Sequence, residues 1–481
     1  MRQNKAMVAI AAFAAIGVLS ACGARVSDAE VQAAQGAAPA ATVAVPDASA
    51  PQDPAAPLTG QDAPAVPASV RSTPTDAAVP SAPVAGDPQK GKPGKATPVV
   101  APGGSAAAPK CTAKLSPIVL GQVGTFSGLV GASLGSGKTG LAVWAADVNA
   151  RGGIACHPVV LYSMDDASDP SKSAAAVETL VKDKKVVAFV ASFPGIVINA
   201  YRSTLDKFDI PTIGGDLLSG EWSEDPNLYA VGGVNRVTYY AAIKNAADQN
   251  RKKVGLLYCV ESVTCTDGKT ATIAAARDTG STIAYQASVS LTQTDYLPQC
   301  QSAKNASVDV LLSLLDSASL ERLGRSCSSI GYFPLIAASA LAAIPAIADN
   351  PDLNKAGVLA SPAVFPWMQS DSPAQAAFQK AYKTFAPTAA PAGSAAIAWA
   401  SGMMLEKAMG NLGEKATATV TSEMVFQGLG TIKNETLDKL IPPTTYTLHQ
   451  AKSPEQLCAY VILLKNQAWT APTGSKFLCA P

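Results

Sequence analysis

From about residue 116 onward, short apolar runs alternate with stretches whose apolar residues recur at helical spacing. After the first run, Leu141, Trp144 and Val148 follow a helical period, and Gly152-Gly153 supplies a stop. Strands are predicted at 116–123, 158–164, 186–192, 210–213, 253–259, 282–287 and 308–315, and helices near 170–182, 199–207, 238–250, 268–278 and 296–305. This regular alternation predicts an α/β fold with doubly wound parallel sheets.

Doubly wound sheets bind ligands beyond the carboxyl ends of their strands. The candidate mouth is therefore formed by the residues that follow the predicted strands: 124–127, Asp165-Asp166, Ser192-Phe193, 214–216, Glu261 and Asp316-Ser317. Phe126 and Phe193 stand at strand ends and are candidates to line an apolar cleft, with structural packing as the alternative role.

The beginning of the chain has a different composition. Residues 1–21 combine Arg2 and Lys5 with an apolar run of roughly sixteen residues, and this pattern predicts an export signal peptide. The run ends in Leu19-Ser20-Ala21-Cys22, which resembles a bacterial lipobox, so Cys22 is the predicted lipid attachment site on the extracytoplasmic face of the membrane. An ordinary signal peptide with a chance cysteine is the alternative. Residues 22–109, rich in Ala and Pro, are predicted to be a disordered tether.

Charge and histidine content argue against several classes of function. Lys plus Arg number 37 against 36 for Asp plus Glu, with no basic block, so no nucleic-acid partner is expected. The chain has two histidines, His157 and His449, and no C-x-x-C pair. Neither a metal site nor a Ser-His-Asp or Cys-His arrangement is therefore expected. The protein is predicted to use no cofactor and not to be an enzyme.

Eight cysteines follow Cys22. An even number in an exported chain indicates disulfides, although eight cysteines allow 105 connectivities. The first two precede neighbouring predicted strands, and the others fall into close successive pairs along the chain. Sequential pairing is therefore predicted: Cys111 with Cys156, Cys259 with Cys265, Cys300 with Cys327, and Cys458 with Cys479.

Residues 132–139 fit a relaxed Walker A pattern, in which Lys138 would reach phosphates and Thr139 would hold Mg²⁺. Thr139 and Gly140 fall at the start of the first predicted helix, and an exported domain has no ATP supply. Lys138 is therefore interpreted as a solvated residue at the rim of the mouth.

A set of motifs resembles a known family. A G-x-x-S-G loop (Gly124, Ser127, Gly128) is followed by Gly140, which opens a helix ending in D-x-N-A-x-G-G-I at 147–154, and then by a strand ending in Asp165-Asp166. In these features residues 118–181 resemble the N-terminal lobe of type I periplasmic binding proteins of the leucine/isoleucine/valine-binding kind. Weaker likeness covers about 115–475, and 446–470 resembles the closing strand pair of that family.

The resemblance implies two Rossmann-like lobes, joined by three crossovers, that close over a small solute. The implied N-terminal lobe is 110–234 plus about 358–445, and the implied C-terminal lobe is about 235–357 plus 446–481. It also implies a monomer that delivers the solute, such as an amino acid or a related molecule, to an ABC-type permease. A sensor that presents its ligand to a membrane receptor and a structural envelope lipoprotein with a vestigial cleft are the alternatives.

The resemblance also implies a set of site residues. The family's first-lobe carboxylate grip is matched by Ser192 and by 214–216, where Asp216 replaces a hydroxyl donor with an acceptor that repels a ligand carboxylate when ionised. The second-lobe match, 338–340, lacks the family's acidic residue, for which Glu261 or Asp316 could substitute. These departures leave room for an amine, amide, aromatic or neutral solute. The predicted ligand-binding residues are Phe126, Ser127, Ser192, Phe193, Gly214, Gly215, Asp216, Glu261, Asp316 and Ser339.

Overall fold

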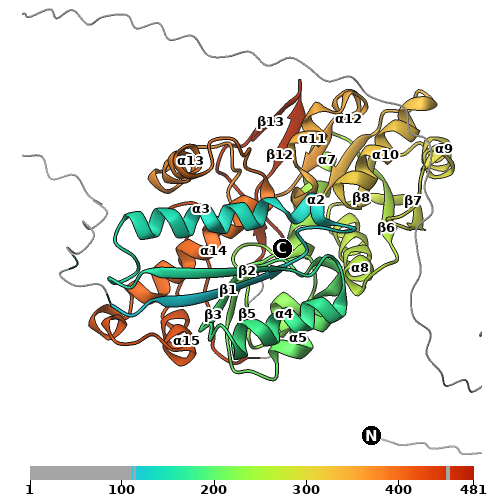
Figure 1. Ribbon diagram of the computed structural model, residues 1–481. Coiled ribbons are helices and arrows are strands. Elements are labelled where there is room, and N and C mark those ends of the chain that lie inside the picture. The colour runs from blue at the N-terminus through green and yellow to red at the C-terminus, as the bar shows by residue number, and fades with distance from the viewer. Residues whose placement is uncertain (1–110, 112–114, 451–455) are drawn as a thin grey trace, which may run out of the picture. The chain divides into compact units, whose positions relative to one another are not determined.

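The computed structural model describes residue 111 and residues 115–450 and 456–481 (Figure 1). The predicted signal peptide, the lipid attachment site Cys22 and the predicted tether lie outside these residues. All described residues belong to one compact unit, Val99–Pro481. No helix among them is both long enough and apolar enough to cross a membrane.

The first sheet is parallel and has five strands in the order β2-β1-β3-β4-β5. The prediction of parallel strands separated by helices is confirmed here, with ends shifted by a few residues. The Asp169 carboxylate caps α4 by accepting hydrogen bonds from the backbone N–H groups of Ser171 and Lys172, as expected for a helix opened by Asp and Pro. The strands are β1 Ile118–Gly124, β2 Val159–Asp165, β3 Ala188–Ser192, β4 Thr212–Gly215 and β5 Leu228–Tyr229.

Four long helices pack around the first sheet: α3 Ser136–Ala150, α4 Pro170–Lys182, α5 Ile198–Leu205 and α14 Gly393–Gly410. Figure 1 shows α3 and α14 on one side of this sheet and α4 and α5 on the other. The backbone of α14 comes close to α3 because Gly402 leaves room for the Trp144 ring, where a Cβ atom would collide. We call this sheet and its helices the first lobe.

The second sheet has seven strands in the order β13-β12-β10-β9-β8-β6-β7. Its first five strands in the chain are parallel, whereas β12 and β13 form an antiparallel hairpin at the edge, so the sheet is mixed rather than wholly parallel. The hairpin occupies the C-terminal end of the expected strand pair at 446–470. The strands are β6 Lys253–Cys259, β7 Thr282–Val289, β8 Val310–Leu314, β9 Leu335–Ala338, β10 Val358–Ala360, β12 Ile462–Lys465 and β13 Ala468–Thr470.

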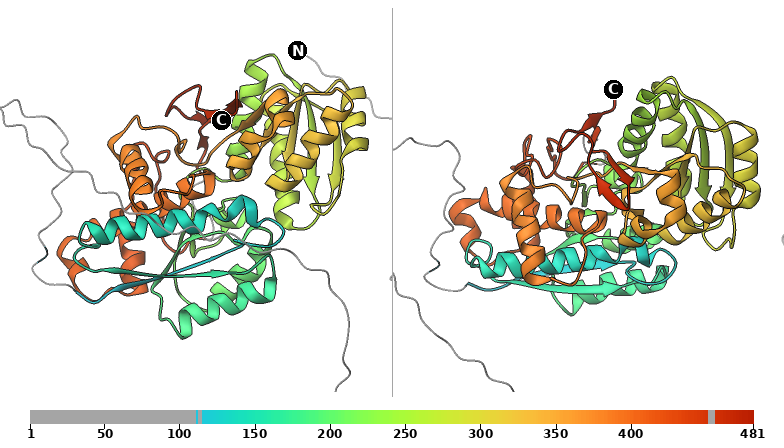
Figure 2. Two further views of the ribbon diagram at one scale, coloured as in Figure 1. Left: turned by 45° about the horizontal axis from the view of Figure 1, so that its top comes forward. Right: turned by 90° about the horizontal axis from the view of Figure 1, so that it is seen from above.

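We call the second sheet, with its helices, the second lobe. Both views of Figure 2 show the red C-terminal strands at the edge of this sheet. Its helices are α7 Asn235–Asp248, α8 Val263–Asp278, α9 Leu297–Asn305, α10 Ser317–Ser329, α11 Pro345–Asp349 and α12 Pro351–Ala356, and the short β11 Cys458–Ala459 and β14 Leu478–Cys479 pair nearby.

The chain passes between the two sheets three times, after β5, after β10 and before β12. The second passage lies close to the expected lobe boundary at about 358. Residues 358–360 pair with β9 in the second sheet, and the chain leaves the second lobe after Ala360. It then forms α13 Pro373–Phe385, α14 and α15 Ser422–Gly430.

All four predicted disulfides are present in sequential order: Cys111–Cys156, Cys259–Cys265, Cys300–Cys327 and Cys458–Cys479. Cys259 ends β6 and Cys265 lies in the first turn of α8, so the second bridge closes the loop between this strand and this helix. This placement matters because the loop borders the cleft between the lobes.

Candidate solute-binding cleft

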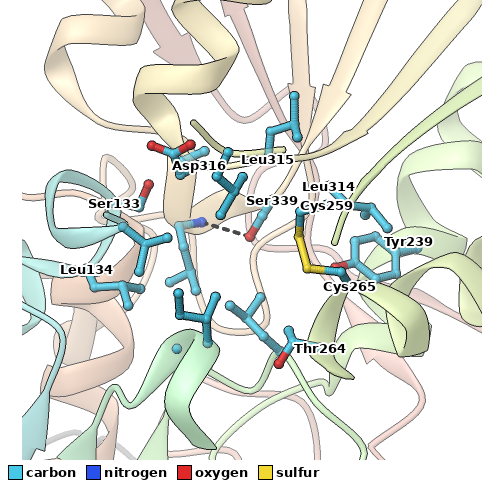
Figure 3. A pocket seen from close by; sticks show the side chains of 17 residues that line it. Ser133, Leu134, Tyr239, Cys259, Thr264, Cys265, Leu314, Leu315, Asp316 and Ser339 are labelled. Atoms are coloured by element: carbon cyan, nitrogen blue, oxygen red, sulfur yellow. Dashed lines mark hydrogen bonds between the residues drawn. A yellow bond between two sulfur atoms is a disulfide. The ribbon is translucent and has the colours of Figure 1, made fainter. Parts of the chain in front are cut away.

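Residues of both lobes enclose a cavity of about 80 Å³, which we call the inner cavity (Figure 3). This volume holds several water molecules or a short hydrocarbon group. The first lobe contributes α2 (Gly131–Leu134), the 3₁₀ turn Gly195–Val197 and the loop after β4, and the second lobe contributes the strand ends of β6, β8 and β9. The lining residues are Val130, Ser133, Leu134, Gly195, Ile196, Leu218, Tyr239, Cys259, Thr264, Cys265, Leu291, Leu314, Leu315, Asp316, Ser339, Leu341 and Ala342.

Two polar side chains of the inner cavity, those of Asp316 and Ser339, already accept hydrogen bonds from the backbone of their own turns. The Asp316 carboxylate caps α10 by accepting from the backbone N–H groups of Ala318 and Ser319 at 3.0 and 3.2 Å. The Ser339 hydroxyl accepts from the Leu341 N–H at 3.3 Å (Figure 3). Because leucine, valine and isoleucine supply eight of the seventeen lining residues and the exposed wall is mainly apolar, the cavity suits an apolar group rather than an ammonium or a carboxylate.

Hydrogen bonds join the lobes at two places. The Ser133 hydroxyl accepts from the Ser317 N–H at 2.9 Å and donates to the Ser317 hydroxyl at 3.2 Å, and both residues are buried. The Gly220 N–H donates to the Asp267 carboxylate at 3.3 Å. The lobes are therefore in direct polar contact on both α10 and α8 of the second lobe.

A second hollow, which we call the outer groove, adjoins the inner cavity. Ile196 lines both, and the loop closed by the Cys259–Cys265 disulfide supplies residues to each. The outer groove contains one cationic and one anionic side chain. Its lining residues are Pro170, Ile196, Val197, Asn199, Ala200, Arg202, Ser203, Glu261, Ser262 and Val263.

Among the predicted residues, Asp316 and Ser339 line the inner cavity and Glu261 lines the outer groove. The Glu261 carboxylate accepts from the Ser290 hydroxyl and the Leu291 N–H, both at 2.7 Å, and from the Val260 N–H at 3.0 Å. These bonds tie the disulfide loop to the segment after β7. Glu261 therefore shapes the cleft wall as well as facing the groove.

Asp216 is buried inside the first lobe, directly after β4, and lines neither the inner cavity nor the outer groove. Its carboxylate accepts from the N–H groups of Gly195 at 2.8 Å and Leu218 at 3.1 Å, and from the Trp222 indole N–H at 3.0 Å. Burial raises the pKa of Asp216 to about 6, and these hydrogen bonds offset only part of that effect. The residue thus joins the loops after β3 and β4, both of which supply cavity residues.

The other predicted residues at the ends of β3 and β4 are also buried. The Ser192 hydroxyl accepts from the Tyr201 hydroxyl at 3.1 Å and lies within 3.4 Å of the Val123 N–H. Side chains at Gly214 and Gly215 would collide with Ser401 and Trp222 respectively. Phe193 is fully buried against Gly137 of α3. This group packs the first lobe behind the inner cavity and does not line it.

Phe126 and Ser127 lie in the loop after β1, outside both hollows. Their N–H groups donate to the Asp165 carboxylate at 2.9 and 3.2 Å. Burial acts to raise the pKa of Asp165, but hydrogen bonds from Ser127, Ala167 and Phe126 outweigh it and hold this pKa below its ordinary value. Lys138 lies 5.9 Å from the centre of the Phe126 ring. Residues 136–139 of the Walker-like stretch are helical, in the first turn of α3, so they form no open phosphate loop.

Most residues of the inner wall were not predicted from the sequence. Leu134, Ile196, Leu218 and Leu341 carry no chemical signature, and their shared location depends on how the lobes meet. The disulfide was predicted, but its place in the wall was not (Figure 3). Sulfur atoms of Cys259 and Cys265 and a carboxylate oxygen of Glu261 lie within 4.8 Å of one another, yet sulfurs bonded to each other are not the thiolates that bind metal ions.

Comparisons with known proteins agree with this architecture. Residues 117–450 match the model of the family described as periplasmic binding protein. A search of curated proteins found no match. A possible leucine/isoleucine/valine-binding protein from Rhodopirellula baltica superposes with a TM-score of 0.65 at 13% identity, covering 75% of this chain and 98% of its own.

Two further solved structures share the fold. The branched-chain amino acid transporter substrate-binding protein LivJ from Streptococcus pneumoniae, in complex with isoleucine, has a TM-score of 0.62 at 17% identity and covers 74% of this chain and 98% of its own. A fatty acid ABC transporter substrate-binding protein from Thermomonospora curvata has a TM-score of 0.62 at 18% identity and covers 76% and 91%. The chain belongs to the periplasmic binding protein family, in its type I group that resembles leucine/isoleucine/valine-binding proteins.

Proposed function

We propose that this protein captures a small organic solute between its two lobes and delivers it to an ABC-type importer. The observation that carries the proposal is the inner cavity, which both lobes enclose and which lies beyond the carboxyl ends of β6, β8 and β9. The protein acts by binding rather than by catalysis. The family implies an extracytoplasmic location, and we place the protein there as a monomer held to the membrane by a lipid on Cys22.

The part of the solute that enters the inner cavity is apolar. Asp316 and Ser339 are engaged as helix and turn caps, so they offer little to a charged ligand group. The solved relatives include a protein in complex with isoleucine and a fatty acid transporter component, both ligands with an apolar part. Among the residues predicted from sequence, Glu261, Asp316 and Ser339 are our proposed ligand contacts in this protein, together with the leucines of the wall.

A thermal-shift screen tests this function. The purified protein is screened against carboxylic acids, amides, alcohols, amino acids, sugars and ATP. A solute present at a hundred times its dissociation constant should stabilise the protein by roughly 2.7 kcal/mol. The control is Ala342→Phe, because Ala342 lines the inner cavity and a phenyl ring there fills it. The same solute should then lose its effect.

Three other outcomes would contradict the proposal. Stabilisation by sugars or ATP alone would mean that the solute is not a molecule with an apolar part. An equal shift in the Ala342→Phe variant would move the site out of the inner cavity. If no compound in the screen raises the melting temperature, and native mass spectrometry shows no retained ligand, a structural role in the envelope would be favoured.

A further inference from the structure

The outer groove contains an arginine whose hydrogen-bonding capacity is largely unused. The Arg202 side chain is 40% exposed, and its Nη1 atom lies 3.7 Å from the carboxylate of Asp225, which is buried. Its Nε atom is buried and has no hydrogen-bond partner among the residues that the structure describes, so this atom does not face the groove. A guanidinium carries five N–H donors, four of them on its two Nη atoms. Because the Arg202 side chain is partly exposed, the donors that it offers to a ligand in the groove are those on the Nη atoms.

In contrast to Arg202, the one carboxylate of the groove has its hydrogen-bonding capacity largely used. Glu261 already accepts three hydrogen bonds, from Ser290, Leu291 and Val260, at 2.7 to 3.0 Å. A ligand ammonium would have to share these oxygens, whereas a ligand carboxylate meets unused donors on Arg202. The hydrogen-bonding balance of the groove therefore favours an acceptor, and a carboxylate is the acceptor that a guanidinium binds best.

Two helix ends add partial positive charge to the groove, whose lining otherwise has one arginine and one glutamate. Val263 is the first residue of α8, and Asn199 lies in the first turn of α5. The N-terminal end of a helix carries a partial positive charge. These two ends act in the same direction as the charge of Arg202, whereas the N-terminal end of α4, at Pro170, is already capped by the Asp169 carboxylate.

The inner cavity and the outer groove are neighbours, because Ile196 and the disulfide loop border both, so a molecule that passes Ile196 would extend from one into the other. We infer that the solute is a short amphipathic monocarboxylic acid, with its hydrocarbon chain in the inner cavity and its carboxylate on Arg202 in the outer groove. This inference rests on the proposed function and names the class of solute. It makes Arg202, rather than the strand-end residues of the first lobe, the specificity-determining residue.

Isothermal titration of the purified full-length protein with hexanoate, hexanamide and norleucine tests this assignment. The three ligands share a six-carbon chain: hexanamide has a neutral amide in place of the carboxylate of hexanoate, and norleucine carries an additional ammonium on carbon 2. Hexanoate should bind at least about tenfold more tightly than hexanamide, the size expected for a hydrogen bond to a charged group. Norleucine should bind no more tightly than hexanoate, since Glu261 is already engaged.

The Arg202→Gln variant should lose about tenfold or more in affinity for hexanoate and change its affinity for hexanamide by no more than about twofold. Arg277→Gln is the matched control, because Arg277 lies in the last turn of α8, about 20 Å along that helix from the groove. It should leave both affinities unchanged. Arg202→Gln leaves the buried Asp225 carboxylate without its ion-pair partner. The double variant Arg202→Gln/Asp225→Asn removes this unpaired acid and so checks the result.

The outcomes separate this inference from the proposed function. Equal losses for hexanoate and hexanamide in Arg202→Gln, or tighter binding of norleucine than of hexanoate, would overturn the carboxylate site and leave the apolar cavity intact. Ala342→Phe should weaken hexanoate and hexanamide alike. If Ala342→Phe changes neither affinity, or if none of the three ligands binds, the proposal that the inner cavity binds the solute is wrong. The inference about Arg202 then fails as well.

Discussion

At the scale of single residues, Asp216 is a buried acid that ties together two loops of the cleft. Its pKa is raised to about 6 from 3.8, so between these values the folded protein keeps a proton that the unfolded chain has lost. The free energy of unfolding should therefore fall as pH rises from about 4 to 6, by on the order of 3 kcal/mol for this group. Urea unfolding at both ends of this window should show the decrease in the wild type and lose it in Asp216→Asn.

Asp165 provides the control of opposite sign. Hydrogen bonds from the loop after β1 hold the pKa of Asp165 below its ordinary value despite partial burial. Its contribution to stability is present above the unfolded pKa and is lost as pH falls through the folded pKa. Asp165→Asn should therefore flatten the acid side of the stability curve. If Asp216→Asn and Asp165→Asn altered the curve in the same direction, the account of Asp216 would be wrong.

At the scale of helices and strands, periodicity predicted the elements with clear patterns. β6 was expected at 253–259 and lies at Lys253–Cys259, and α4 begins at Pro170 as its cap indicated. In contrast, α14 is buried on nearly every side and has no polar face, so no helical period marks it in the sequence. β10 has only three residues and is defined by its pairing with β9 and β12.

The candidate site was less predictable from the sequence than the helices and strands, because it also depends on contacts between segments that are distant in the chain. Sequence reasoning selected polar and aromatic residues at strand ends, and the structure uses several of them to pack the loops. Ser192 is hydrogen-bonded inside the first lobe, and Phe193 fills the space beneath α3. Six leucines contribute to the wall of the inner cavity, and their place there depends on the contact between the lobes. The hydrophobic pattern within one segment does not indicate which residues meet the other lobe.

The disulfide between β6 and α8 gives a test at the same scale. Loop closure predicts that replacing Cys259 and Cys265 with Ser costs about 2 kcal/mol of stability, whereas replacing Cys300 and Cys327 costs about 4 kcal/mol, because the second bridge closes a longer loop. Affinity for the solute should show the reverse order, since only the first bridge lines the inner cavity. Chemical denaturation and titration of both double variants measure the two quantities. Equal effects on affinity would remove the disulfide loop from the site.

At the scale of the folded unit, the proposed capture of a solute requires an open and a closed form, and we expect the contact between the lobes to set the balance between them. Ser133 accepts the Ser317 N–H at the start of α10, and this bond joins the first lobe to the second beside the inner cavity. In an open form water can satisfy the same N–H group. A hydroxyl that bonds only in the closed form therefore stabilises that form selectively.

Replacing Ser133 with Ala leaves the Ser317 N–H buried without its acceptor in the closed form alone. That costs about 1 to 3 kcal/mol and should lower the ratio of closed to open molecules by about 5- to 150-fold. Small-angle scattering without solute should give a larger radius of gyration for Ser133→Ala, and saturating solute should restore the wild-type value. Ser136→Ala is the matched control, because the Ser136 hydroxyl lies 2.6 Å from that of Ser394 on α14, within the first lobe. An identical radius for both variants and the wild type would mean that this bond does not hold the lobes together, and closure would then depend on the apolar wall and on the solute that fills it.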